Sequence, residues 1–350
     1  MADVQLRHWC THALDHLIEE LNVLGHHDDL ELYHRYTREG VDMLRNSIKF
    51  AWSYEQAARL PIEQRRDWLT QDEPTLPFDT IAVEMEFGEA QRERQRESID
   101  QIESYVDGVI YVCQHLYCAP RFVRARIIDD LDLRPDTGGW LCWAVQKFVR
   151  IDKPNEGRWL FAPVIGVSLP REEALEWEDS HSALQMHSIN PGEPLVNLLH
   201  LIDAESLINS LRAHTRDADM MDLYRRTVDN LGAQVQEDMH AVAALCMMLS
   251  AANVRTKVHA APLKLNVKRE KRGREPIFEY RTIEVDLDAP GVQSISTGAG
   301  DKRRSPRLHL RRGHDRHYAD GRVVKIPPMI VGDKSRGIVL KDYIIKKTED

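Results

Sequence analysis

Apolar residues near the start of the chain recur at helical spacing. Between residues 7 and 24 they fall every three or four positions, and Gly25 follows them as a helix-ending signal. The spacing between residues 28 and 60 predicts one or two further helices, broken by Gly40 and ended before Pro61. We therefore expect a helical layer at the N-terminus.

Alternation of apolar and polar residues, which is typical of strands, begins at Ile81 and continues to Phe87. Glu84 and Glu86 would share one face of this strand. A solvated face is the simpler interpretation, and a carboxylate pair for acid/base chemistry or metal binding is the alternative. Stretches rich in β-branched and aromatic residues predict a central sheet, antiparallel or mixed, with further strands at 105–117, 140–150 and 159–169.

Helical spacing returns after the predicted sheet. It indicates long helices at 195–211 and 219–252, and Asn253 stands where the second of them would end. Helices of this length can cover a face of the sheet. We place a boundary between two parts of the chain after residue 254.

Residues 305–347 combine strand alternation with turn chemistry. Apolar residues at 308–310 and 323–326 alternate with or flank charged ones, and Tyr318-Ala319-Asp320-Gly321 lies between them as a turn signal. The pattern predicts a hairpin with a cationic ridge on one face of its first strand and apolar residues behind it. The ridge consists of Arg307, His309 and Arg311, and the opposite face of Leu308, Leu310 and Arg312.

These elements predict an α+β protein of three segments. A helical N-terminal region spans 1–75, and an α+β body, with a central sheet and long helices, spans 76–254. A small basic β module spans 255–350. The chain length of 350 residues is enough to bury a large core.

Charge is unevenly distributed between these segments. Residues 255–350 hold 23 Lys and Arg against 13 Asp and Glu, a net charge of +10, whereas residues 1–254 carry −19, and together they give the −9 of the chain. This asymmetry predicts an anionic partner for the basic module, nucleic acid first, with an acidic surface of the same protein as the alternative.

Two groups of cations stand out in the basic module. The run from Lys264 to Arg274 precedes the predicted hairpin, so the two groups could converge on one surface. Contacts with nucleic acid would be mainly to phosphates. The residues that we predict to make them are Lys268, Arg269, Lys271, Arg272, Arg307, His309, Arg311, Arg312, His314 and Arg316.

Common enzyme signatures are absent from the sequence, including the nucleophile elbow, the zinc-protease motif, the P-loop and the dinucleotide fingerprint. This favours a binding protein over an enzyme, and it predicts no cofactor. The alternative is a metal-independent ribonuclease, in which His309 and His314 would move protons while neighbouring arginines stabilise the charged phosphorane.

Histidines and cysteines give no strong metal signal. His8, His12 and His16 repeat every four residues along one helical stripe, but no nearby carboxylate pattern completes a site, so we interpret them as partly packed and partly solvated. The five cysteines form no Cys-x-x-Cys pair. Neither a zinc ribbon nor a disulfide framework is indicated, and we expect no metal.

Trp140, Trp143 and Trp159 supply large aromatic side chains to the middle of the chain. Core packing is the simpler interpretation of these residues. The functional alternative is a groove that binds a peptide, because aromatic side chains give a large contact area at low entropic cost.

No apolar run in the sequence approaches the roughly 20 residues that cross a bilayer. The polar start from Met1 to His8 lacks the regions of a signal peptide. We therefore expect a protein that stays in the cytosol and has no membrane partner.

The C-terminal motif carries a resemblance to a known family. Arg307-Leu308-His309-Leu310-Arg311-Arg312-Gly313-His314, followed by Val323–Val331, resembles a motif of phage and mobile-element proteins, the family of the second type V-A anti-CRISPR protein. Weaker similarity around Gly139–Trp143 extends the resemblance over about residues 120–350.

The resemblance implies a regulatory protein of phage or plasmid origin that evades host defence in the bacterial cytosol. The family's mode of action is recognition of the N-terminal peptide of the type V-A CRISPR effector nuclease during its translation, which leads to loss of the mRNA. Two partners follow: a nascent or folded target protein, and RNA or ribosome-associated mRNA. A general RNA-binding phage protein is the alternative.

Overall fold

The computed structural model describes the chain in several stretches. They are residues 6–24, 31–53, 76–89, 92–93, 104–121, 123–125, 134, 136, 138–150, 153–168, 195–198, 239–286, 307–311, 314–318, 320–331 and 333–338.

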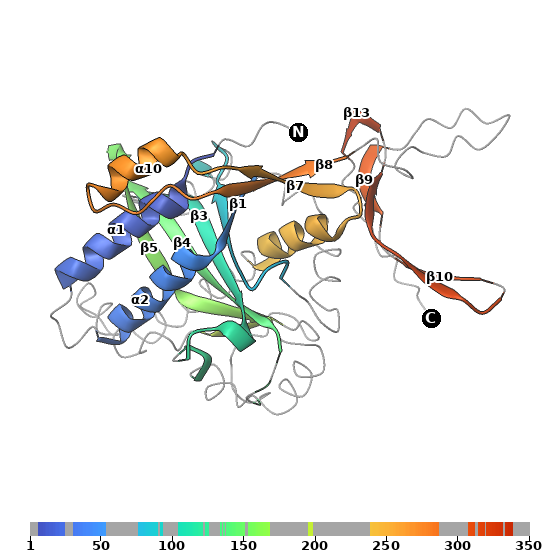
Figure 1. The fold of residues 1–350 in the computed structure, drawn as a ribbon, viewed down its shortest axis with the longest axis horizontal. Coiled ribbons are helices and arrows are strands. Elements are labelled where there is room, and N and C mark those ends of the chain that lie inside the picture. Colours follow the sequence, from blue (N-terminus) through green and yellow to red (C-terminus); the bar gives the residue numbers. More distant parts are fainter. Residues whose placement is uncertain are drawn as a thin grey trace.

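An eight-stranded mixed sheet forms the centre of the fold, with strand order β6-β5-β4-β3-β2-β1-β8-β7 (Figure 1). β1 runs parallel to both of its neighbours, whereas all other neighbouring pairs are antiparallel. The sheet together with its helices gives the α+β class that the sequence predicts. The strands are β1 (Ile48–Ser53), β2 (Thr80–Glu86), β3 (Ser104–His115), β4 (Trp140–Arg150), β5 (Lys153–Ser168), β6 (Leu195–Leu198), β7 (Val254–His259) and β8 (Tyr280–Val285).

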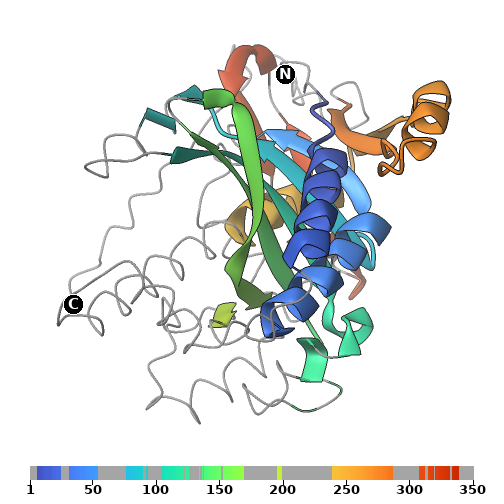
Figure 2. The same cartoon turned by 90° about the vertical axis from the view of Figure 1, so that its left-hand side faces the viewer.

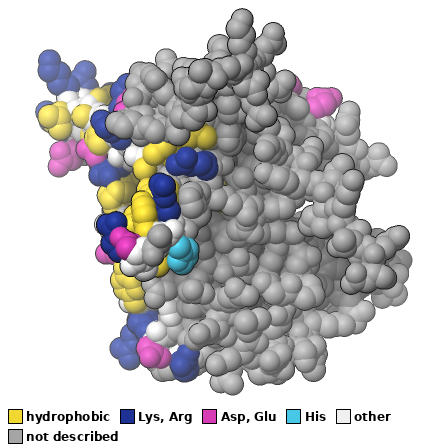
Figure 3. Space-filling model, turned by 90° about the vertical axis from the view of Figure 1, so that its right-hand side faces the viewer, with side chains coloured by type: hydrophobic (Ala, Val, Ile, Leu, Met, Phe, Trp, Pro, Cys, Tyr) yellow, Lys and Arg dark blue, Asp and Glu magenta, His cyan; other side chains and the backbone are white. Residues whose placement is uncertain are grey.

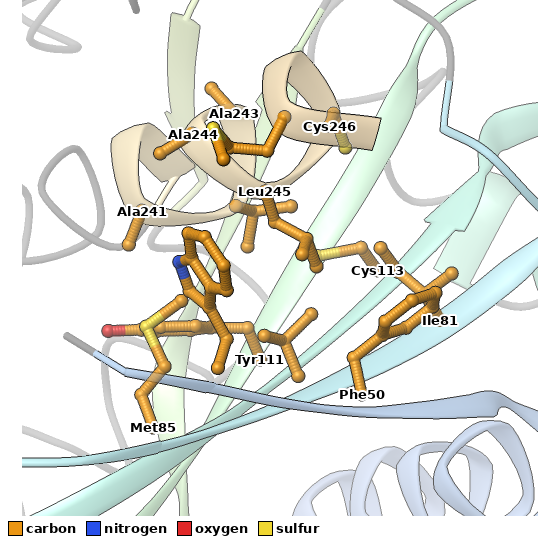
Figure 4. Close-up of a cluster of buried hydrophobic side chains, with 14 of the residues drawn as sticks. Phe50, Ile81, Met85, Tyr111, Cys113, Ala241, Ala243, Ala244, Leu245 and Cys246 are labelled. Atoms are coloured by element: carbon orange, nitrogen blue, oxygen red, sulfur yellow. The ribbon is translucent and has the colours of Figure 1, made fainter. Parts of the chain in front are cut away.

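Helices cover both faces of this sheet (Figure 2). α1 (Trp9–Leu24) and α2 (Glu31–Asn46) pack on one face, and the helix at 239–250 packs on the other. Figure 4 shows Leu245 of this last helix pointing towards the strands that carry Tyr111 and Ile81. Central strands are therefore buried on both sides, which is why β2 exposes little between its two end residues.

The predicted helix at 7–24 is present as α1, but the prediction for 28–60 is wrong in two respects. α2 continues through Gly40 without a break. A Cβ at this position would lie 2.6 Å from the Phe161 ring and 2.7 Å from the Trp143 ring, so a larger residue would not fit there. This glycine lets the helix approach the sheet and does not break it. Residues 48–53 form a strand, since Phe50 and Ala51 bury opposite faces of β1.

The helix expected at 195–211 begins instead as strand β6, whose Leu195–Leu198 backbone pairs with Ser168–Ile165 of β5. A short apolar run carries little information on period, so helix and strand are hard to separate there. The remainder of that prediction lies outside the described residues. The helix at 239–250 lies within the range predicted as 219–252.

The eight-stranded sheet takes strands from all three segments that we predicted. β1 comes from the segment 1–75, β2 to β6 come from 76–254, and β7 and β8 come almost entirely from 255–350. The first two strands of the basic segment thus belong to the same sheet as the body.

Two smaller sheets follow β8. β9 (Arg307–Arg311) pairs antiparallel with β12 (Met329–Val331) and parallel with β13 (Asp333–Ile338). The side-chain amide of Asn253 donates to the Ile330 carbonyl at 2.9 Å and accepts from the Ile330 amide at 2.9 Å, which fixes β12 to the start of β7. Among the described residues, no helix is long and apolar enough to cross a membrane.

The predicted C-terminal hairpin is present in altered form. β10 (His314–His317) pairs with β11 (Val323–Ile326) around a turn at 318–322, as the turn signal indicates, but β9 pairs elsewhere and is not its first strand. Val323 and Val324 of β11 are 53% and 41% exposed, so neither side chain is buried against the body.

Candidate functional site

The helix α10 (Leu263–Glu270) lies between β7 and β8 and carries the first part of the basic run, which continues in the turn after it. Asn266 fixes its inner side, since its side-chain amide donates to the Ile277 carbonyl and accepts from the Ile277 amide, both at 2.8 Å. Gly273, with a φ of 64°, follows the helix and allows the chain to turn back. The helix therefore keeps one face on the protein and presents the other to solvent (Figure 2).

The outer side of α10 and the turn after it is cationic and partly apolar. Its exposed cations are Lys264, Lys268, Lys271, Arg272 and Arg274, and we call these five residues the α10 cation cluster. None of the five forms an ion pair with a residue that the structure describes. Three aliphatic side chains beside them are also exposed: Leu263 at 78%, Leu265 at 45% and Val267 at 52%.

Arg269 departs from our prediction that it binds nucleic acid. Its guanidinium lies 2.5 Å from the Asp15 carboxylate of α1 and donates to the Glu275 carbonyl at 2.6 Å. Its side chain is only 12% exposed, so the structure assigns it to the attachment of α10 to α1. The partner stands 254 positions away, and no local pattern marks the pair.

The β10–β11 hairpin carries a second set of exposed charges. Arg316 is exposed, as is Arg322 at the end of the turn, and Arg311 is exposed at the end of β9. Figure 3, which faces the end of the molecule that carries β10, shows Lys and Arg side chains interleaved with hydrophobic ones on the described part of this face. Arg311 and Arg316 are among the residues predicted to bind nucleic acid, whereas Arg322, which follows the predicted turn, is not.

These two basic regions lie at opposite ends of the molecule (Figure 1). The expectation that they converge on one surface is wrong, because the β7–β8 ribbon separates α10 from β9 and β10. Arg255 and Lys257 lie along this ribbon, but Asp286 at 3.8 Å and Glu284 at 3.3 Å partly balance their charges. The described cations therefore form two separate sites.

Some predicted residues can be placed only by their backbone. Arg307 and His309 lie in β9, and His314 lies in β10. Arg312 lies outside the described residues. The ribonuclease arrangement of His309 and His314 therefore stays a prediction.

The three tryptophans are buried, as core packing requires. Trp140 packs with the core under the helix at 239–250, whereas Trp143 and Trp159 pack with the core under α1 and α2. They lie on opposite faces of one sheet and do not line a common groove.

Glu84 is buried at the centre of the sheet, and our interpretation of it as a solvated residue is wrong. One of its oxygens, Oε1, accepts hydrogen bonds from the Cys10 amide at 2.9 Å and from the Tyr280 hydroxyl. Burial raises the pKa of this carboxyl to about 7 and also raises the pKa of the Tyr280 hydroxyl. Only Glu86 of the predicted pair reaches solvent, where Arg7 binds it at 3.0 Å.

The histidine stripe of α1 lies partly in this same region. The rings of His8 and Tyr280 pack in a T-shaped arrangement, with 5.2 Å between the centroids. Burial lowers the pKa of both His8 and His12. Burial also lowers the pKa of the nearby Lys49 to about 8. Among the described residues, no group of three or more His, Cys, Asp or Glu side chains could hold a metal ion.

Comparison with known proteins gave no match for this chain among family models, curated proteins or solved structures.

Proposed function

We propose that this protein binds RNA through its basic C-terminal elements and thereby lowers the expression of a target polypeptide. The observation that carries the proposal is the α10 cation cluster, in which five exposed cations lie within eleven positions without described acidic partners. Cations held close together on a helix and the turn after it attract a polyanion, and release of counterions from the phosphates favours binding.

The β10–β11 hairpin supports the same proposal from the other end of the molecule. It projects from the body (Figure 1) and exposes Arg316 and Arg322. Two separated cationic sites suit a long, flexible anion that can reach both, and an RNA strand has that form.

Affinity for RNA at several salt concentrations tests the proposal. For single strands the logarithm of the binding constant falls with the logarithm of the salt concentration, with a slope of about −0.7 per phosphate contact. We expect Lys268→Glu with Lys271→Glu to weaken binding for all sequences alike and to make the slope shallower. The matched control is Arg38→Glu with Arg121→Glu, two exposed cations elsewhere. Wild-type affinity that does not change with salt would contradict the proposal.

The polypeptide partner rests on a separate observation. Leu263, Leu265 and Val267 are exposed beside lysines, and aliphatic side chains add little to phosphate binding but fit a polypeptide surface. The motif resemblance suggests a type V-A CRISPR effector nuclease as the target and a phage or plasmid as the source.

Cell-free translation of such an effector nuclease tests this second part. We expect the wild-type protein to lower the level of the effector mRNA, and Leu263→Asn with Val267→Asn to reduce the effect while RNA affinity is retained. An mRNA level that the wild-type protein leaves unchanged would contradict the proposed target. The same RNA incubated without metal should stay intact, since cleavage would favour the ribonuclease alternative.

A further inference from the structure

The tip of the β10–β11 hairpin has a defined backbone. The Tyr318 amide donates to the Arg322 carbonyl at 2.9 Å, and the Gly321 amide donates to the Tyr318 carbonyl at 3.0 Å. Gly321 has a φ of 83°, which glycine adopts without strain. The Asp320 carboxylate accepts a hydrogen bond from the Arg322 amide at 3.1 Å, which adds a third hydrogen bond to the turn. The side chains at the tip are therefore held in a fixed relation.

Three of these side chains form one group on one face of the hairpin. Arg316 lies in β10, Tyr318 follows two positions later, just after the end of the strand, and Arg322 lies across from Tyr318. The guanidinium carbon of Arg316 lies 5.1 Å from the centroid of the Tyr318 ring, and that of Arg322 lies 5.3 Å from it. We call these three residues the Tyr318 clamp.

Each member of the Tyr318 clamp is exposed. Tyr318 is 37% exposed, and Arg316 and Arg322 are exposed as well. Both faces of β11 are also exposed to solvent. The adjacent Val323 and Val324 point to opposite faces of the hairpin, and both side chains reach solvent. An aromatic ring with two cations and an apolar stem thus projects into solvent, where a ligand can reach it.

We propose that the Tyr318 clamp stacks an unpaired base of a single-stranded RNA. The inference rests on the proposed function and adds to it the class of RNA. An aromatic face stacks on any base, and the planar guanidinium groups can stack on the same base or bind the phosphates beside it. Asp320 orients one of these groups, since its Oδ2 accepts from the Arg322 Nε at 2.6 Å.

Helical RNA fits the hairpin less well. Its bases are already stacked on each other, and its major groove is too deep and narrow for side chains to read. The wide major groove of B-form DNA admits a two-stranded ribbon, so duplex DNA is the competing ligand that a test must include.

The experiment uses an RNA oligonucleotide with one fluorescent 2-aminopurine, offered to the full-length protein as a single strand, as an RNA duplex and as the corresponding DNA duplex. We expect the single strand to bind most tightly and its fluorescence to change on stacking. Replacement of Tyr318 by Leu should weaken binding by about 5-fold to 150-fold, the range for loss of one stacked base, and should abolish the fluorescence change.

Conservative variants separate stacking from other roles of the hairpin. Tyr318→Phe keeps the ring and should bind nearly as well as the wild type, whereas Arg316→Lys keeps the charge but loses the planar group and should bind more weakly. Tyr117→Leu is the matched control, because Tyr117 is a 59% exposed tyrosine elsewhere on the protein.

The outcomes distinguish this inference from the proposed function. If Tyr318→Leu binds as tightly as the wild type while variants of the α10 cation cluster bind more weakly, the stacking inference fails and RNA binding stands. Tighter binding of either duplex than of the single strand also overturns the inference. If the wild-type protein binds no RNA at all, both fail.

Discussion

The Tyr280 hydroxyl donates a hydrogen bond to Glu84 across an intervening strand. Tyr280 lies on β8 and Glu84 on β2, and β1 separates them in the sheet. The same carboxylate oxygen accepts from the Cys10 amide at the start of α1. One buried carboxyl group thus joins a helix to two strands that do not pair with each other.

Removal of the Tyr280 hydroxyl should destabilise the fold. In Tyr280→Phe, Glu84 would lose a hydrogen-bond donor inside the core, which typically costs about 1–3 kcal/mol. Chemical denaturation measures the free energy of unfolding. Tyr117→Phe removes an exposed hydroxyl that donates to Asp79 at 2.6 Å, and it should change stability by less than about 0.5 kcal/mol. An equal loss of unfolding free energy in the two variants would mean that the buried hydrogen bond stabilises the fold no more than the exposed one.

The raised pKa of Glu84 predicts a pH dependence of stability with a definite sign. Burial raises this pKa from 4.5 to about 7, so between these values the folded state holds a proton that the unfolded state releases. Stability from this group is complete below pH 4.5 and is lost as the pH rises to about 7. The full loss is about 3 kcal/mol if Cys10 and Tyr280, the groups that face the carboxyl, keep their protons.

Comparison with Glu84→Gln isolates this contribution. His8 and His12 have lowered pKa values and destabilise the fold as the pH falls, so they act in the opposite direction in both proteins. The difference in unfolding free energy between the wild type and the variant should therefore decline from pH 4.5 to 7. A difference that stays constant over this range would show that Glu84 titrates normally.

Gly40→Ala should destabilise the protein although alanine favours helices. Alanine in a helix is worth up to about 1 kcal/mol over glycine, but the new Cβ would meet two aromatic rings at 2.6 Å and 2.7 Å. We expect a net loss of about 1–2 kcal/mol, seen as a lower melting temperature. At Gly157 the nearest atom, 2.9 Å away, belongs to the flexible Lys147 side chain, so Gly157→Ala should be milder.

Stability and function should separate on the small sheet of β9, β12 and β13. Ile330 is buried and pairs with Leu310, so Ile330→Ala should cost about 2–5 kcal/mol of stability. Arg311 is exposed at the end of β9, and Arg311→Ala should keep the melting temperature while it weakens RNA binding. A less stable Arg311 variant would show that this side chain supports the fold.

The parts of the fold that the sequence predicts best are those with a long, regular pattern. α1 and β2 follow from apolar spacing, because each is long enough to show its period, and β3 and β4 follow from their content of β-branched and aromatic residues. β1 was missed, since Lys49-Phe50-Ala51-Trp52 is short and almost fully buried on both sides, so apolar spacing does not reveal its period.

The parts of the site that local patterns miss depend on distant partners. The burial of Glu84 requires Tyr280, 196 positions later, and the attachment of Arg269 requires Asp15. Spacing along the chain carries no trace of either pair. The turn at Tyr318 was predicted correctly as a turn, but the approach of two guanidinium groups to its ring depends on the cross-strand register of β10 and β11.

The position of β1 between β2 and β8 also sets the order in which the protein can assemble during synthesis. β1 can pair with β2 soon after both strands are synthesised. The other edge of β1 pairs with β8, which begins at Tyr280, 196 positions after Glu84 of β2. At typical synthesis rates this interval lasts about 10–40 s. For that time an apolar strand edge is open and the Glu84 carboxyl lacks its partner on β8, so slow translation should raise the risk of aggregation.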